Sequence, residues 1–180
     1  MGVDKDILRK CKRLASDRLS AIELSRYRLD EIDSRLSEYA YELRNNPNGH
    51  NLYELLGLLR FFRFMDTYQF RTGTVHAFIV FYEFLKFAGR QGQQRYKLTP
   101  VQVFQFANIL GFYADDIRRL IRDVLIFVPR KFSKTTEVAS LAIWDMLFGD
   151  SNAEAYTGAN SYEQAQICFK EIKAIMRNLD

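Results

Sequence analysis

The stretch that decides the fold is Val124-Leu-Ile-Phe-Val-Pro-Arg-Lys-Phe-Ser-Lys-Thr135. It begins with an apolar run, residues 124–128, of largely β-branched or aromatic side chains, which is typical of a buried strand. Residues 129–133 form a short loop, and a helix is expected from about residue 134 to residue 148. The order of strand, loop and helix predicts the opening of a parallel α/β sheet.

The junction between this strand and this helix is where phosphate-binding loops lie. Amides at a helix N-terminus are unpaired and carry roughly half a positive charge, so they favour an anion. Lys134 can reach the β- and γ-phosphates of a nucleotide, and the Thr135 hydroxyl can ligate Mg²⁺. Arg130 adds a charge that can stabilise a transferring phosphoryl group. The pattern predicts binding of ATP and Mg²⁺.

The loop departs from the common pattern G-x-x-x-x-G-K-[ST]. Val128 stands at the first glycine and Ser133 at the second. If the second position needs a positive φ, a serine there costs on the order of 1–2 kcal/mol of backbone strain. Either the loop tolerates this strain, or the affinity for nucleotide is reduced. Phe132 adds a large ring that either shields the phosphates or simply packs.

The N-terminal half of the sequence is patterned as helix. Apolar residues recur at three- and four-residue steps over residues 8–43, which predicts one long helix or two in series. Turn residues at 45–49 interrupt the pattern. Apolar helices are expected at about 52–65 and 75–88, followed by a polar connector at 89–94.

The C-terminal half alternates between helices and strands. Thr99 is expected to cap a helix that has Pro100 at its first position and runs to about residue 110. A weak strand is expected at 155–157, and Ser161 begins a last helix in capping-box spacing. The predicted fold class is α/β: an N-terminal helical region, then the start of a P-loop NTPase parallel sheet with flanking helices.

Length and composition are sufficient for one hydrophobic core, and the length alone favours one domain or slightly more. The chain has 180 residues, 48% of them hydrophobic and 14% aromatic, which excludes a disordered chain. The change of pattern near residue 95 predicts two domains. Residues 1–95 form a helical region, and residues 96–180 form the first part of a P-loop ATPase domain.

The charge balance permits a polyanionic partner without requiring one. The net charge is +4, from 26 Lys and Arg against 22 Asp and Glu. Basic residues gather at 9–13 and 118–122, where they are either solvated helix faces or contacts to nucleic acid.

Cysteine and histidine usage argues against a zinc site. Cys11 and Cys168 are far apart and read as ordinary thiols of a reducing compartment, and His50 and His76 have no partners at zinc-ligand spacing. The most apolar stretch, residues 76–89, is shorter than the about 20 residues that cross a bilayer. No signal peptide is visible, so we expect a soluble, cytoplasmic protein with no membrane partner.

The loop and its flanks resemble the large subunits of tailed-phage terminases. The stretch Val128-Pro-Arg-Lys-Phe-Ser-Lys-Thr-Thr136 is similar to their variant Walker A loop, which commonly reads Val-Pro-Arg-Lys-Asn-Gly-Lys-Thr/Ser. Residues 98–102, Leu-Thr-Pro-Val-Gln, and Gly111-Phe-Tyr113 resemble the family's Leu-Thr-Pro-Trp-Gln and Gly-Trp segment. Residues 155–165 resemble a later strand and the start of a Gln-Ala helix. The resemblance covers about residues 53–180.

The resemblance implies a motor that hydrolyses ATP to drive double-stranded DNA into a preformed capsid in the host cytoplasm. Its partners would be the portal and the terminase small subunit, and it would assemble as a homo-oligomeric ring. A C-terminal metal-dependent nuclease is also a family property. By position, Lys134 and Arg130 would be catalytic, Thr135 would hold Mg²⁺ and Gln102 would recognise adenine. The phosphate-binding set would be Pro129, Arg130, Lys131, Phe132, Ser133, Lys134, Thr135 and Thr136.

Other parts of such a motor are missing from the sequence. Hydrolysis needs a strand that ends in Asp and is followed by a Glu that activates water, and no such acidic pair follows Thr135. Asp115 and Asp116 precede the loop and fit a helix end better. No carboxylate cluster is present for a two-metal nuclease. We therefore expect an N-terminal fragment that binds ATP weakly and does not turn it over.

Two other functions fit parts of the sequence. The stripe over residues 22–43 approximates heptads, so the chain could be a helical protein–protein interaction module, with Lys134 a solvated cation in a degenerate loop. The basic clusters alone would fit a helical nucleic-acid-binding protein. Gln102 has a simpler interpretation as a surface glutamine, and Trp144 is expected in the core.

Overall fold

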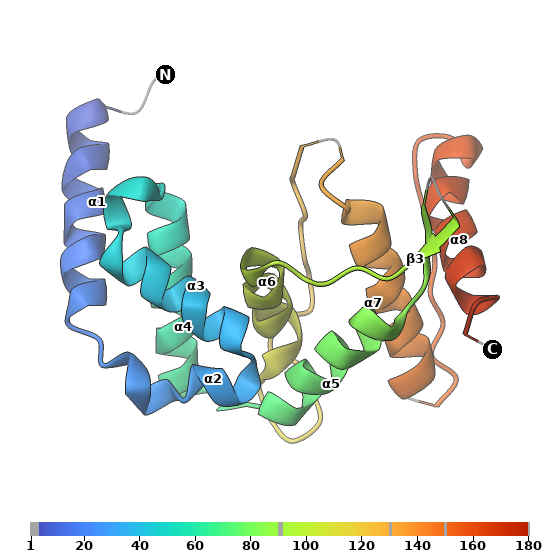
Figure 1. Cartoon of the computed structure of the whole chain (residues 1–180), viewed down its shortest axis with the longest axis horizontal. Helices are drawn as coiled ribbons and strands as arrows, with labels where there is room; N and C mark the ends of the chain where they lie inside the picture. The colour runs from blue at the N-terminus through green and yellow to red at the C-terminus, as the bar shows by residue number, and fades with distance from the viewer. Residues whose placement is uncertain (1–3, 90–91, 130, 150, 180) are drawn as a thin grey trace. The chain divides into compact units, whose positions relative to one another are not determined.

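The fold is described from a computed structural model, shown in Figure 1. The structure describes residues 4–89, 92–129, 131–149 and 151–179. Contacts group the chain into two compact units, which alternate along the sequence. Unit 1 comprises Met1–Ala77 and Thr99–Asp123, and unit 2 comprises Phe78–Leu98 and Val124–Asp180. The division into domains 1–95 and 96–180 stays a prediction, because grouping by contacts does not test independent folding.

Unit 1 is built from helices with one short ladder. Its helices are α1 (Lys5–Ser20), α2 (Leu29–Ile32), α3 (Ser34–Asn45), α4 (Leu52–Thr67), the first part of α5 (Thr72–Phe84) and α6 (Pro100–Gly111), with 3-10 turns η1 (Leu24–Tyr27) and η2 (Pro47–Gly49). Side chains cap the helix starts, as expected for Asp and Asn: Asp4 caps α1, Asp33 caps α3, and Asn51 caps α4. The predicted cap at Thr99 is confirmed.

The ladder in unit 1 joins β1 (Gln69–Phe70) to β4 (Phe112–Tyr113), which are antiparallel. Gly111 directly precedes β4, and a Cβ built there would lie 2.2 Å from a ring atom of Phe70. Only glycine fits this close approach, so α6 ends and the ladder begins at this residue.

An aromatic cluster forms the centre of unit 1. The ring of Phe61, on α4, has its centroid 5.3–5.9 Å from four other rings. These belong to Phe62, Phe70, Phe104 and Phe112. Burying one such side chain contributes about 1.5–3 kcal/mol, so the cluster holds α4, α6 and the ladder together.

The apolar pattern of residues 8–43 is divided among more helices and turns than the sequence predicted. Residues 8–43 lie on α1, η1, α2 and α3, so the expectation of one long helix or two in series was wrong. The chain reverses at Arg28, whose φ of 47° is left-handed and stops a helix from continuing. Leu29, Ile32 and Leu36 are buried, so the heptad-like stripe packs inside unit 1 and is not an exposed docking seam.

Unit 2 pairs two helices with a short hairpin. Its elements are the end of α5, the antiparallel strands β2 (Phe87–Gly89) and β3 (Gly92–Gln94), α7 (Lys134–Phe148) and α8 (Tyr162–Met176). The helices α7 and α8 pack on each other, and β2 contacts α8. Trp144 is buried as predicted, with its ring 5.5 Å from that of Phe78.

The predicted parallel sheet is not present in the described part of the chain. Residues 124–128 and 155–157 are irregular, and the side chains of Leu125 and Phe127 are 92% and 95% exposed. A parallel strand needs a neighbour for its backbone groups, and none of the described strands pairs with either segment. The fold is mixed and dominated by helices, with two small antiparallel ladders.

None of the helices in the described ranges combines the length and apolar character that a bilayer span requires.

Candidate nucleotide-binding site

The loop that precedes α7 has an unusual backbone. Lys131 and Ser133 have φ angles of 68° and 54°, in the left-handed region. Ser133 is the N-cap residue of α7, although its side chain caps no amide. The positive φ considered for Ser133 is therefore present, at the cost of side-chain strain that a glycine would avoid. Turns of this kind direct amides towards an anion.

The first turn of α7 holds the carbonyl of Ser133 in place. The Thr136 hydroxyl donates a hydrogen bond to this oxygen at 2.6 Å, and the amide of Glu137 donates to it at 3.0 Å. The Thr136 hydroxyl therefore already forms a hydrogen bond within the first turn of α7. This distinguishes it from the Thr135 hydroxyl, which is the predicted ligand of Mg²⁺. The structure assigns Thr136 a role in shaping the loop.

A hollow of about 310 Å³ opens beside Lys134 and Thr135. It is bounded by the irregular segment before the loop, the first turns of α7 and the N-terminal half of α8. Its lining is Ile126, Lys134, Thr135, Val138, Gln164, Ile167 and Cys168. The volume lies at the lower end of the range for small-molecule sites.

The lining of this hollow favours a negatively charged ligand. Among the described residues, its lining contains one ammonium group, from Lys134, and no carboxylate. The Cys168 thiol has its pKa raised by burial and by the nearby Glu171, so it stays protonated near neutral pH. The described lining of the hollow therefore combines one positively charged group, hydrogen-bonding groups and apolar side chains.

The remaining loop residues are placed as follows. Pro129, Lys131 and Phe132 are exposed, and Arg130 lies outside the described residues. Phe132 has its side chain at the surface and does not pack in the core.

The side chain of Gln102 is buried, so the interpretation of this residue as a surface glutamine does not hold. It belongs to α6 in unit 1, and only 9% of it is exposed. Its Oε1 accepts hydrogen bonds from the amide and the hydroxyl of Thr99, both at 2.9 Å. This oxygen completes a capping box at the start of α6.

The described residues contain no group of three His, Cys, Asp or Glu side chains that could hold a metal ion. Asp115 accepts hydrogen bonds from the amides of Ile117 and Arg118 and pairs with the Arg118 side chain. These backbone hydrogen bonds lower its pKa to about 2. Asp115 lies in a bend after β4 and not at the end of a helix, and its interpretation as a structural residue stays a prediction.

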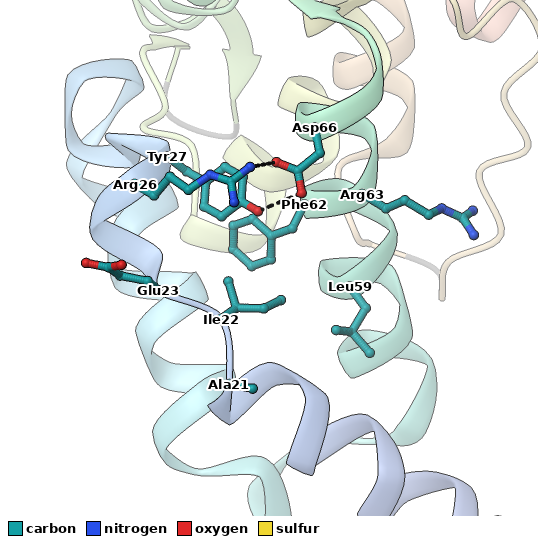
Figure 2. A pocket seen from close by; sticks show the side chains of 9 residues that line it. All are labelled: Ala21, Ile22, Glu23, Arg26, Tyr27, Leu59, Phe62, Arg63 and Asp66. Atoms are coloured by element: carbon teal, nitrogen blue, oxygen red, sulfur yellow. Dashed lines mark hydrogen bonds and ion pairs between the residues drawn. The ribbon is translucent and has the colours of Figure 1, made fainter.

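A larger hollow, of about 440 Å³, lies in unit 1 (Figure 2). At its polar end the Asp66 carboxylate pairs with Arg26 and accepts a hydrogen bond from the Tyr27 hydroxyl at 3.1 Å. The Tyr27 ring packs on Phe62, and Arg63 points away from the hollow in Figure 2. Because these polar groups satisfy one another, this hollow shows no group aimed at a ligand, and we place the candidate chemistry at the α7 loop.

Gln164 and Cys168 line the hollow although sequence reasoning did not select them. Figure 1 shows that α7 and α8 begin at the same end of unit 2. Gln164, near the start of α8, and Lys134, at the start of α7, line the same hollow. The only signal in the sequence was the position of Gln164 three residues after the cap Ser161. The pairing of the two helices depends on tertiary packing, which periodicity does not reveal.

In unit 2, a turn with two left-handed residues leads into the N-terminus of α7, where unpaired amides favour an anion. Residues 100–179 match the family model of the terminase large subunit, ATPase domain. Over these residues the resemblance to terminase large subunits is confirmed, and at family level the match supports an ATPase of a DNA-packaging motor. No curated protein and no solved structure matched the chain.

Proposed function

We propose that this chain is the ATP-binding part of a viral DNA-packaging motor, with residues 129–136 as its phosphate-binding loop. One observation carries the proposal: Lys134 and Thr135 begin a helix behind a turn with two left-handed residues, beside a hollow in which no described lining residue is a carboxylate. The match over residues 100–179 supports it, because the loop lies within the matched range.

The loop residues have different roles in binding Mg²⁺-ATP. The amides at the start of α7 bind phosphate oxygens, and Lys134 neutralises their charge. The Thr135 hydroxyl is a ligand for Mg²⁺, which also binds the phosphates and keeps several waters. Arg130 stabilises charge on the transferring group. Gln102 recognises the adenine.

The wider proposal follows the family. The motor translocates double-stranded DNA as a homo-oligomeric ring, in contact with the portal and the small subunit in the host cytoplasm, and its nuclease acts through residues other than those described. The interaction-module alternative has lost its main support, because Leu29, Ile32 and Leu36 of the stripe are buried.

The proposal is tested by replacing Lys134. We expect Lys134→Ala to lower the affinity for Mg²⁺-ATP at least tenfold, since it removes the charge that faces the phosphates. In a melting experiment, ATP at about 100 times its Kd should stabilise the wild-type chain by about 2.7 kcal/mol and the variant far less. Lys170→Ala, at an exposed lysine of α8, is the matched control.

The two cysteines provide an independent readout of the same prediction. Mg²⁺-ATP should slow alkylation of Cys168, which lines the hollow, and leave alkylation of the exposed Cys11 unchanged. Equal melting shifts for the wild type and Lys134→Ala, or no shift with ATP at all, would contradict the proposal.

A further inference from the structure

The positive charge of the chain is concentrated on its first helix. Of the 16 residues of α1, six are Lys or Arg and two are Asp, so this helix carries a charge of +4. The whole chain also has a net charge of +4, because the residues outside α1 comprise 20 basic and 20 acidic side chains, which cancel. A helix with this excess in an otherwise neutral chain has the electrostatic signature of a surface that meets a polyanion.

Four of these basic side chains lie together on the solvent side of α1. Lys5, Arg9 and Arg13 follow one another at four-residue steps, so they form a row about 12 Å long, with Lys10 beside it. All four are exposed, and we call them the basic row. In Figure 1, α1 lies at one side of unit 1 next to α3 and α4, against which it packs through other residues such as the buried Leu19.

The basic row is not neutralised by other elements in the part of the chain that the structure describes. Its one ion pair there joins Arg9 to Asp6 of the same helix at 3.7 Å, and these side chains are 82% and 79% exposed. A pair this exposed is weak, because water and salt screen it. Lys12 differs from the row, since it is half-buried and donates a hydrogen bond to the carbonyl of Asn48 at 3.2 Å.

The positions of these charges oppose the stability of the helix. Lys5 with Arg9, and Arg9 with Arg13, are like-charged pairs four residues apart, which destabilise a helix. Cations are also unfavourable near a helix N-terminus, where the macrodipole is positive, yet the row occupies the first nine residues of α1. Neither packing nor helix stability accounts for the row, whereas a bound polyanion would.

The pattern of side chains favours nucleic acid over an acidic protein. A partner helix needs apolar contacts among the charged ones, and Ile7 and Leu14, which are 54% and 62% exposed, stand on another side of α1 in a row of their own. Duplex DNA offers closely spaced phosphates, which Lys and Arg bind without any apolar contact.

The other basic cluster of the sequence, residues 118–122, is engaged within unit 1. Arg118 pairs with Asp115 at 2.6 Å, and Arg119 forms an isolated β-bridge with Tyr113. These contacts hold the segment after β4 together. The polyanion contact therefore belongs to α1 and not to this cluster.

We infer that the basic row of α1 is a docking surface for double-stranded DNA, which it contacts through phosphates without regard to base sequence. The inference goes beyond the proposed function, because α1 lies outside residues 100–179 and the contact requires no nucleotide. Four phosphate contacts predict that the logarithm of the affinity falls by about 3–4 for each tenfold rise in salt concentration.

The test is a titration of a short fluorescent duplex with the full chain, followed by anisotropy at several salt concentrations and without nucleotide. Arg9→Gln/Arg13→Gln removes two charges of the row and keeps good helix formers. We expect this variant to bind about tenfold more weakly or worse at low salt, and its salt slope to be smaller by about two. Lys170→Gln/Lys173→Gln, which makes the same charge change at exposed positions of α8, is the matched control and should keep the wild-type slope.

Further measurements separate the inference from its alternatives. A duplex of unrelated sequence should bind equally well, since phosphates carry no sequence information. Arg9→Gln/Arg13→Gln should melt at the wild-type temperature or above and bind Mg²⁺-ATP as the wild type does, which excludes unfolding as the cause of weaker DNA binding.

The inference would be overturned by equal affinities and salt slopes of the wild type and Arg9→Gln/Arg13→Gln, or by a wild-type chain that does not bind the duplex. Stronger competition by poly-L-glutamate than by unlabelled DNA would also overturn it, in favour of an acidic protein partner. A chain that binds DNA through the basic row but binds no ATP would refute the proposed function and leave this inference standing.

Discussion

Ser133 shows how a single residue can be strained where a ligand is expected. Its φ of 54° suits glycine, yet the residue is a serine whose side chain caps nothing in α7. The sequence allowed this position to be identified, because the spacing to Lys134 marks it as the second glycine of the loop pattern. The hydrogen bonds that hold it there come from Thr136 and the amide of Glu137, and only the structure reveals them.

Replacing Ser133 by glycine should stabilise the chain. We expect Ser133→Gly to raise the free energy of unfolding by about 1 kcal/mol in urea titrations, because the left-handed conformation penalises a side chain. Ser161→Gly is the matched control: Ser161 caps α8 with an ordinary φ of −136°, and its hydroxyl accepts a hydrogen bond from the Gln164 amide. That variant should be neutral or destabilising. A stabilising effect of both, or of neither, would show that strain at Ser133 is not the cause.

At the level of elements, the sequence predicted helices better than strands. The α4, α6 and α8 helices begin at or within one residue of the predicted positions, because periodicity and caps are local signals. The apolar run of residues 124–128 looked like a buried strand because composition reports the preference for burial. Whether a strand forms depends on partners elsewhere in the chain, and the described strands offer none.

Two leucine variants test whether residues 124–128 are exposed, in contrast to the core of unit 2. Leu125→Ala should change the free energy of unfolding by less than about 0.5 kcal/mol, since the side chain is 92% exposed. Leu85→Ala, at a fully buried leucine of unit 2, should cost about 2–5 kcal/mol. Urea titration of both variants measures the difference. If Leu125→Ala costs as much as Leu85→Ala, the run is buried in solution and the predicted strand exists after all.

At the scale of the whole molecule, the family match and the described site together lead to a prediction of whether the chain alone binds ATP and whether it hydrolyses ATP. Transfer of the γ-phosphoryl group to water needs a residue that positions or activates the water, in addition to the groups that hold the phosphates. In the part of the chain that the structure describes, no carboxylate lines the hollow beside Lys134. We therefore expect binding and turnover to be separable in this chain, which agrees with the prediction made from the sequence, where no Asp-Glu pair follows the loop.

The purified chain should accordingly bind Mg²⁺-ATP without hydrolysing it. We expect phosphate release at the buffer background, both alone and with double-stranded DNA, under conditions where a titration shows saturable ATP binding. Lys134→Ala serves here to expose a contaminant, because activity that survives this variant does not arise at the loop. Steady phosphate release that Lys134→Ala abolishes would mean that the described residues, together with those around them, already complete a hydrolytic site. The water-activating group would then have to be sought among the carboxylates of unit 2, starting with Glu171, whose Oε1 is buried without a hydrogen-bond partner and whose pKa is raised by burial.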